Sequence, residues 1–199
     1  EVVPPMGAIP IMVDVHEDSF NLDVASLKRA IVHARALGLR PAGVIPVDLF
    51  GHPADYDAIE AIAAEEGMWV IADSAQGFGA TYRGRTTGSI GTISTTSFFP
   101  AKPLGCYGDG GALYTQDAEL ARKIKMIANH GQEQKYIHDV VGCNSRLDTI
   151  QAAVLRIKLR QLDNYIDARR EVASAYDAAF AQIPGVEIPF RAHDSKHVF

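Results

Sequence analysis

Short apolar runs alternate with amphipathic helical stretches along the first two-thirds of the chain. The runs at residues 9–15, 44–47 and 68–72 are separated by helical patterns at about 21–37 and 55–66. Each helical pattern is followed by a glycine, the residue most often found just beyond the end of a helix. This β-α-β-α-β order predicts an α/β fold with a central, mostly parallel sheet and flanking helices.

The rest of the chain continues this pattern and then changes character. A glycine-rich loop is expected at residues 77–91, strands at 92–98 and 111–115, and a helix at about 117–129. From residue 147 to about 183 the chain lacks glycine and proline and carries apolar residues at helical spacing. That spacing predicts one very long helix, or two helices end to end.

The helical stretch also suggests a division into domains. We interpret residues 1–146 as part of a large domain, and residues 147–199 as a long linking helix and the start of a small C-terminal domain. Both ends read as truncated, because the first residues resemble the middle of a chain and residues 195–199 resemble the beginning of a strand. The chain is therefore expected to be an internal fragment.

Composition excludes several classes of protein. The net charge of −5 comes with no basic cluster, so no nucleic-acid partner is expected, and no apolar stretch approaches the ~18 residues of a membrane span. Cys106 and Cys143 show no disulfide or metal-ligand spacing and are interpreted as buried or half-buried thiols in a cytoplasmic protein. No metal site is expected. Histidines such as His197 are expected at the surface, and His52 in a turn.

Asp73 follows an apolar strand pattern at the position where open α/β sheets form ligand clefts. It could simply cap the end of the strand. Alternatively, its carboxylate could face a cationic atom of a ligand. The sequence alone leaves both readings open.

Lys102 lies in a glycine- and proline-rich loop between two expected strands. Most lysines are solvated surface residues, but this one is flanked by Phe98, Phe99 and Leu104. Apolar surroundings favour the neutral amine, which can attack a carbonyl group. Ser97, five residues upstream, offers a hydroxyl suited to a phosphate oxygen.

Short motifs that share these chemical residues follow one another in a fixed order: Asp73-Ser74-Ala75-Gln76, Ser97-Phe98-Phe99-x-x-Lys102, Gly108-Asp109-Gly110-Gly111, His130-Gly131, Gly142-x-Asn144-x-Arg146-Leu147-Asp148 and Gln151-Ala152-Ala153. Together they resemble the DegT/StrS-type nucleotide-sugar aminotransferases, which depend on pyridoxal 5'-phosphate (PLP) and have the large domain of fold type I. The resemblance runs through nearly the whole chain. It implies that a phosphate-binding turn and a ring-stacking aromatic residue lie upstream, so that residues 1–199 alone would bind PLP poorly.

The resemblance assigns roles to four residues around the cofactor. Lys102 would form the Schiff base with PLP and move protons during transamination. Asp73 would pair with the pyridine nitrogen and Gln76 would contact the 3-hydroxyl side of the ring. Ser97 would bind the cofactor phosphate.

The resemblance also implies a homodimer with shared active sites. Asn144 would reach the phosphate of the neighbouring subunit, and Arg146 would contact substrate or make an ordinary salt bridge. The expected substrates are a nucleotide-linked keto-sugar and L-glutamate, and the finer likeness is to members acting on UDP-linked 3-keto-hexuronic acids, with Asp109 where many relatives carry glutamate. A PLP-dependent sugar dehydratase and a non-catalytic regulatory relative remain alternatives, although the dehydratase branch carries histidine where this chain has Lys102.

Overall fold

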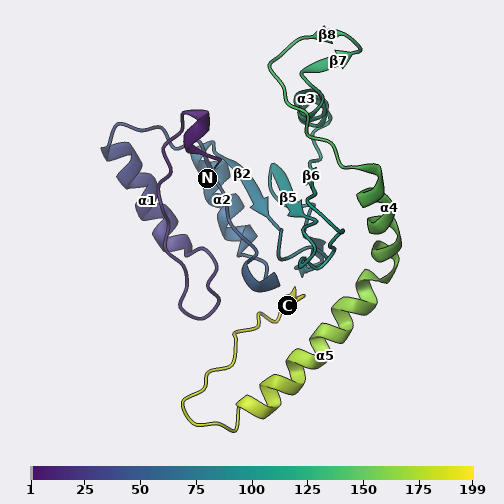
Figure 1. Ribbon diagram of the computed structural model, residues 1–199. Helices are drawn as coiled ribbons and strands as arrows, with labels where there is room; N and C mark the ends of the chain where they lie inside the picture. The colour runs from purple at the N-terminus through teal and green to yellow at the C-terminus, as the bar shows by residue number, and fades with distance from the viewer. Residues whose placement is uncertain (1) are drawn as a thin grey trace.

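A four-stranded sheet forms the centre of the computed structural model, which describes residues 2–199 (Figure 1). Its strands lie in the order β1 (Gly43–Val44), β2 (Trp69–Asp73), β5 (Ile93–Ser97) and β6 (Gly111–Tyr114). The first three strands are parallel, and β6 runs antiparallel to β5. The expected α/β fold with a mostly parallel sheet is confirmed.

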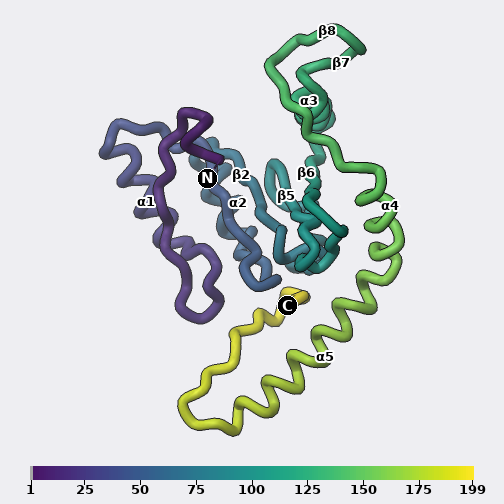
Figure 2. The backbone as a smooth tube through the Cα atoms, viewed as in Figure 1, coloured from purple at the N-terminus to yellow at the C-terminus, as the bar shows by residue number. Residues whose placement is uncertain are grey.

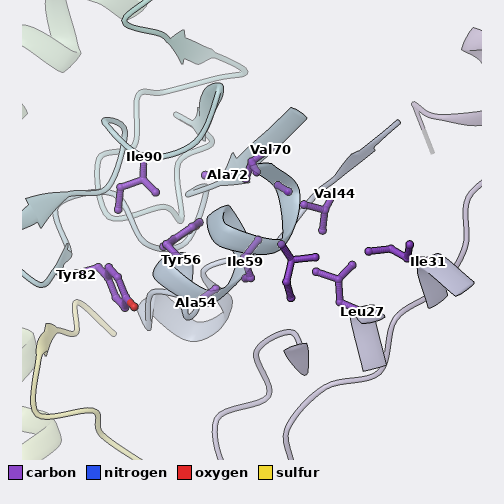
Figure 3. Packing of buried hydrophobic residues seen from close by; sticks show 12 residues of the cluster. Leu27, Ile31, Val44, Ala54, Tyr56, Ile59, Val70, Ala72, Tyr82 and Ile90 are labelled. Atoms are coloured by element: carbon purple, nitrogen blue, oxygen red, sulfur yellow. The ribbon is translucent and has the colours of Figure 1, made fainter. Parts of the chain in front are cut away.

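Helices α1 (Val24–Ala36) and α2 (Tyr56–Glu66) cover one face of this sheet. Each begins at an aspartate whose side chain accepts hydrogen bonds from the first-turn amides, Asp23 in α1 and Asp55 in α2. Gly67 ends α2 in the left-handed conformation, as the sequence predicts. Figure 3 shows the apolar core between the two helices and the strands, to which the following residues contribute: Leu27, Ile31, Val44, Ile59, Val70 and Ala72.

A long, bent helical rod runs past the β6 side of the sheet (Figure 1). It consists of α4 (Thr149–Lys158), a 3-10 turn (η3, Leu159–Gln161) and α5 (Leu162–Phe180), so the second of the two sequence alternatives is correct. Its buried residues pack against the loop that follows β5 and form a second core: Ala80, Phe98, Leu104, Cys106, Leu155, Leu162, Ile166 and Val198. The rod therefore touches the loop that carries Lys102.

Helix α3 (Ala118–Ala128) and the hairpin of β7 (Gln132–Gln134) and β8 (Ile137–His138) project beyond the sheet, as the tube in Figure 2 makes clear. Most of the hairpin side chains are exposed. Of the helices within residues 2–199, none is both long and apolar enough to cross a membrane.

Two sequence predictions of local structure were wrong. Residues 9–15 form no strand within the described chain, because no neighbouring strand supplies hydrogen bonds; only Val15 makes an isolated bridge, to Leu22. The expected loop at 77–91 instead contains a hairpin, β3 (Thr81–Tyr82) and β4 (Arg85–Thr86). Strand β9 (Ser195–Lys196) completes this second sheet by pairing with β3, and short 3-10 turns occupy Pro4–Met6 (η1) and Leu49–Gly51 (η2).

Candidate active site

Asp73 and Ser97 end two neighbouring parallel strands on the same face of the sheet. Asp73, the last residue of β2, pairs in register with Thr95 of β5, and Ser97 follows two residues later. Residues two apart in a strand point to the same face, so Thr95 brings Ser97 to the side of Asp73. Val70 and Ala72 point to the opposite face, into the core under α2.

Lys102 lies in the loop that leaves β5 and returns to β6, residues 98–110, which we call the lysine loop. The loop begins directly after Ser97, at the carboxyl edge of the parallel strands, where open α/β sheets bind ligands. The Lys102 amide donates to the Phe99 carbonyl (2.9 Å), and the side chain is half-buried. Within residues 2–199 its Nζ makes no hydrogen bond or ion pair.

The polar groups at this edge are oriented by hydrogen bonds to the backbone. Asp73 Oδ1 accepts from the Ala75 amide (3.0 Å), which leaves Oδ2 available to a cation. Ser97 Oγ accepts from the Phe99 amide (3.2 Å), so its own O–H can donate to an anion. Gln76 Oε1 accepts from the Phe50 amide (2.9 Å), which leaves the Nε2 hydrogens for another acceptor. These three residues, together with Lys102, offer groups that suit a ring with a cationic nitrogen and an anionic tail.

The lysine loop has a fixed shape although it contains no helix or strand. The buried Cys106 donates its amide (2.8 Å) and its thiol (3.0 Å) to the Phe98 carbonyl. A side chain at Gly105 would come within 2.5 Å of the Pro100 carbonyl oxygen, so only glycine fits there.

The two cysteines differ in exposure. Cys106 is buried as expected, whereas Cys143 is exposed. The prediction for Cys143 was wrong, because this residue lies in the exposed segment that follows the hairpin.

Asn144 and Arg146 lie apart from the four residues at the carboxyl edge. Strand β6 runs antiparallel and carries the chain away from that edge into α3. Asn144 bridges back to Asn129 at the end of α3, and both Asn144 and Arg146 are exposed. A single copy of the chain therefore carries Asp73, Gln76, Ser97 and Lys102 at or just after the ends of β2 and β5, whereas Asn144 and Arg146 follow α3 and the hairpin.

A buried carboxylate directly behind Asp73 escaped the sequence prediction. Asp48 is 0% exposed, and its side chain accepts hydrogen bonds from Tyr56 Oη (2.6 Å), Ser74 Oγ (2.7 Å) and the Ala54 amide (3.2 Å). Its own amide donates to the Asp73 carbonyl (2.9 Å). Burial raises the pKa of Asp48 from 3.8 to about 6, and raises the pKa of Tyr56 above its ordinary value. Asp48 also follows an apolar run, and that signal could have revealed it.

Two histidines are buried where the last residues of the chain meet the turn at residues 50–52. His197 is only 7% exposed, so its expected surface position was wrong: the returning chain covers it. Its Nε2 hydrogen-bonds the Phe50 carbonyl (2.7 Å), and its ring lies 5.4 Å from the ring of His52. Burial lowers the pKa of His52, and lowers the pKa of His197 to about 4. His52 lies in the turn, as expected, and its side chain is buried as well.

No group of three or more His, Cys, Asp or Glu side chains in the part of the chain described by the structure is placed to hold a metal ion. The chemistry available at the carboxyl edge is therefore that of an amine, a carboxylate, an amide and a hydroxyl. A carboxylate beside a pyridine nitrogen, a hydroxyl beside a phosphate and an amine beside an aldehyde are the contacts that PLP requires. The residues present fit this cofactor.

The sequence of the chain was compared with those of known proteins. The sequence profile of the DegT/DnrJ/EryC1/StrS aminotransferase family matches residues 1–199. The UDP-2-acetamido-2-deoxy-3-oxo-D-glucuronate aminotransferase of Pseudomonas aeruginosa is 48% identical over 190 residues, which cover 96% of this chain and 51% of that protein. The chain thus spans about half the length of the curated relatives it matches.

Solved structures give the same picture. A DegT/DnrJ/EryC1/StrS aminotransferase from Brucella abortus superimposes with a TM-score of 0.95 at 44% identity, covering 99% of this chain and 53% of that one. DesV of S. venezuelae, in complex with a ketimine intermediate, superimposes with a TM-score of 0.92 at 44% identity, covering 98% of this chain and 51% of that one. The α/β fold of residues 2–199 is therefore the fold of these aminotransferases.

Proposed function

The chain belongs to the DegT/DnrJ/EryC1/StrS aminotransferase family, and from this premise we propose that the protein is a PLP-dependent aminotransferase. It moves an amino group from L-glutamate to a nucleotide-linked keto-sugar, in the cytoplasmic synthesis of amino sugars for polysaccharides or glycosides. Residues 1–146 belong to the cofactor-binding domain, and residues 147–199 link it to a second, smaller domain.

The observation that carries the proposal is the shared edge of the sheet. Asp73 and Ser97 lie on one face at the ends of adjacent parallel strands, and the lysine loop begins there. PLP supplies the electron sink that stabilises a carbanion; the chain supplies orientation and electrostatics. Asp73 Oδ2 would keep the pyridine nitrogen protonated. The Lys102 amine would bind the cofactor and carry the proton that is moved during the reaction.

The remaining contacts follow from the hydrogen bonds that are already made. The Gln76 Oε1 atom is committed to the Phe50 amide, so Nε2 donates to the 3-oxygen of the ring. The Ser97 hydroxyl accepts from the Phe99 amide and donates to the phosphate. These directions are the ones that a pyridine ring with an anionic tail requires.

The exposed position of Asn144 and Arg146 supports a homodimer with shared active sites. Neither residue belongs to the edge that carries Asp73, so each acts across the interface, Asn144 on the cofactor phosphate and Arg146 on substrate. The guanidinium group of Arg146 suits a carboxylate or a phosphate. A UDP-linked 3-keto-hexuronic acid offers both groups, and the 3-oxo-glucuronate named as the substrate of the Pseudomonas aeruginosa relative favours this class.

Borohydride reduction tests the assignment of Lys102 directly. The full-length protein is incubated with PLP and reduced, and the cofactor mass is located by peptide mass spectrometry. We expect it on the peptide that contains Lys102, and we expect Lys102→Ala to remove it and to lower transamination by ~10²- to 10⁴-fold, the range typical of losing a proton-transferring group. Lys123→Ala, which removes an exposed lysine of α3, is the matched control.

Nitrogen-15 L-glutamate separates the proposal from its rivals. An aminotransferase delivers the label to one of a panel of UDP-, dTDP- and GDP-linked keto-sugars. A dehydratase instead gives a product that has lost water and gained no nitrogen. Retention of full cellular function by Lys102→Ala would point to a regulatory protein and would overturn the proposal.

A further inference from the structure

Two side chains of α4 reach the lysine loop. Lys158 Nζ donates a hydrogen bond to the Gly105 carbonyl (2.7 Å) and lies 4.9 Å from the centre of the Tyr107 ring. Gln151 Oε1 accepts from the Tyr107 amide (2.8 Å). Lys158 and Gln151 are seven residues apart, so they project from the same side of the helix.

The loop has a matching shape on its side of the contact. A side chain at Gly108 would come within 2.9 Å of Gln151 Nε2, so a glycine there lets the helix approach the backbone. Gly105 likewise has no room for a side chain. Between these two glycines, Cys106 ties the loop to the Phe98 carbonyl from the inside. Segment 105–108 is thus held on one side by the hydrogen bond of Cys106 to the Phe98 carbonyl and on the other by side chains of α4.

We propose that Lys158 and Gln151 are positioning residues, which hold segment 105–108 so that the amine of Lys102 stays at the carboxyl edge beside Asp73. The inference rests on the proposed function. It deepens that function, because it makes the linking rod part of the machinery that aims the reactive amine. Neither side chain has to touch cofactor or substrate for this role.

The physical reason lies in how little else orders the loop. Apart from the bonds already described, the loop backbone within the described chain is held by the bond from the Phe98 amide to the Gly110 carbonyl (2.7 Å) and by the bond from the Cys106 thiol to the Gly108 carbonyl (3.1 Å). A hydrogen bond from a charged donor is stronger than one between neutral groups. Reacting groups tolerate little displacement, since a shift of about 1 Å costs roughly 100-fold in rate. A loop released from α4 is therefore expected to keep its fold but lose rate.

The basic last turn of α4 supplies a matched control. Both Arg156 and Lys158 lie in that turn, where a positive charge stabilises the helix end. Only Lys158 contacts the loop; Arg156 is exposed. Lys158→Met removes the charge and the loop contact, whereas Arg156→Met removes a charge alone. Lys158→Arg keeps a charged donor for the Gly105 carbonyl and is expected to retain most of the wild-type behaviour.

Hydrogen exchange of the cofactor-free protein reads the loop directly. In Lys158→Met we expect the amides of the lysine loop to exchange at least ~10-fold faster while the peptide of β2 is unchanged, since only the loop loses a bond. Gln151→Met should release the Tyr107 amide in the same way. Gln151→Glu, which keeps an acceptor oxygen, should not.

The loaded protein gives the second readout. Single-turnover reaction with L-glutamate is expected to slow by ~10- to 100-fold in Lys158→Met, with the KM for L-glutamate within about twofold of wild type. Arg156→Met should match wild type in both measurements. Loop exchange in Lys158→Met equal to that of Arg156→Met, or an increase spread equally to β2, would overturn the inference. If the wild-type protein retained no PLP, the proposed function would fail, and the exchange data would still decide whether α4 holds the loop.

Discussion

Asp48 offers the sharpest test of the electrostatics behind the site. Its carboxyl group is fully buried and accepts three hydrogen bonds, from Tyr56, Ser74 and the Ala54 amide. Burial nevertheless dominates and raises its pKa from 3.8 to about 6. The substitution Asp48→Asn removes the charge at nearly constant shape. Its Oδ1 can still accept from Tyr56, and its Nδ2 can donate to Ser74.

The sign and size of the effect follow from linkage. Between the two pKa values the folded state binds more protons than the unfolded state, so the stability of the wild type falls as the pH rises through this window. The full difference, from 3.8 to about 6, corresponds to about 3 kcal/mol at about 1.4 kcal/mol for each pH unit. Between pH values of roughly 4.5 and 7.5, about 2 kcal/mol of this is lost. Asparagine does not titrate, so Asp48→Asn should gain this amount on the wild type over that range.

Denaturant unfolding of wild type and Asp48→Asn across this pH range, without cofactor, measures the difference in their free energies of unfolding. Groups that titrate alike in both proteins do not affect this difference. About 2 kcal/mol is equivalent to a Tm difference of roughly 4–8 °C for a domain of this size. Asp139→Asn, at an exposed carboxylate, should show no such trend. A stability difference that stays constant with pH, or that grows as the pH falls, would show that Asp48 does not have a raised pKa in the folded state. Adding PLP should shrink the effect, because a cation beside Asp73 favours the ionised form of Asp48 as well.

Two further predictions concern the place where the chain end meets the turn at residue 50. Burial lowers the pKa of His197 from 6.5 to about 4, so the unfolded state binds more protons than the folded state between these values. The free energy of unfolding is therefore expected to fall as the pH drops from 6.5 toward 4, by up to about 3 kcal/mol. His197→Gln, whose amide can still donate to the Phe50 carbonyl, should remove this loss in the same unfolding series, and an unchanged acid dependence would contradict it. Gly51→Ala should lower Tm more than Gly185→Ala: both glycines have φ of 81°, but a side chain at Gly51 would lie 2.8 Å from the Phe199 amide, whereas Gly185 faces open space. Equal Tm losses would show that the contact with Phe199 does not matter.

Much of the fold could be predicted from local sequence patterns. Alternating runs and helical stretches located α1, α2, α3 and the parallel strands to within a few residues, because each element has its own period and its own cap. The run at 9–15 misled for the opposite reason: its composition suits a strand, but a strand exists only where another strand pairs with it. The hairpin at 81–86 was missed because its two strands are only two residues long.

The candidate site divides along the same line. The sequence was enough to single out Asp73, Gln76, Ser97 and Lys102 as candidates, since strand ends and a glycine-rich loop are local features and the motifs follow one another in order. That Asp73 and Ser97 share a face became visible only in the fold, because it depends on the register between β2 and β5. Only the tertiary structure buried Asp48 behind them and brought Lys158 onto the Gly105 carbonyl. Burial and long-range contact depend on what the rest of the chain packs against a residue, and no local period encodes that.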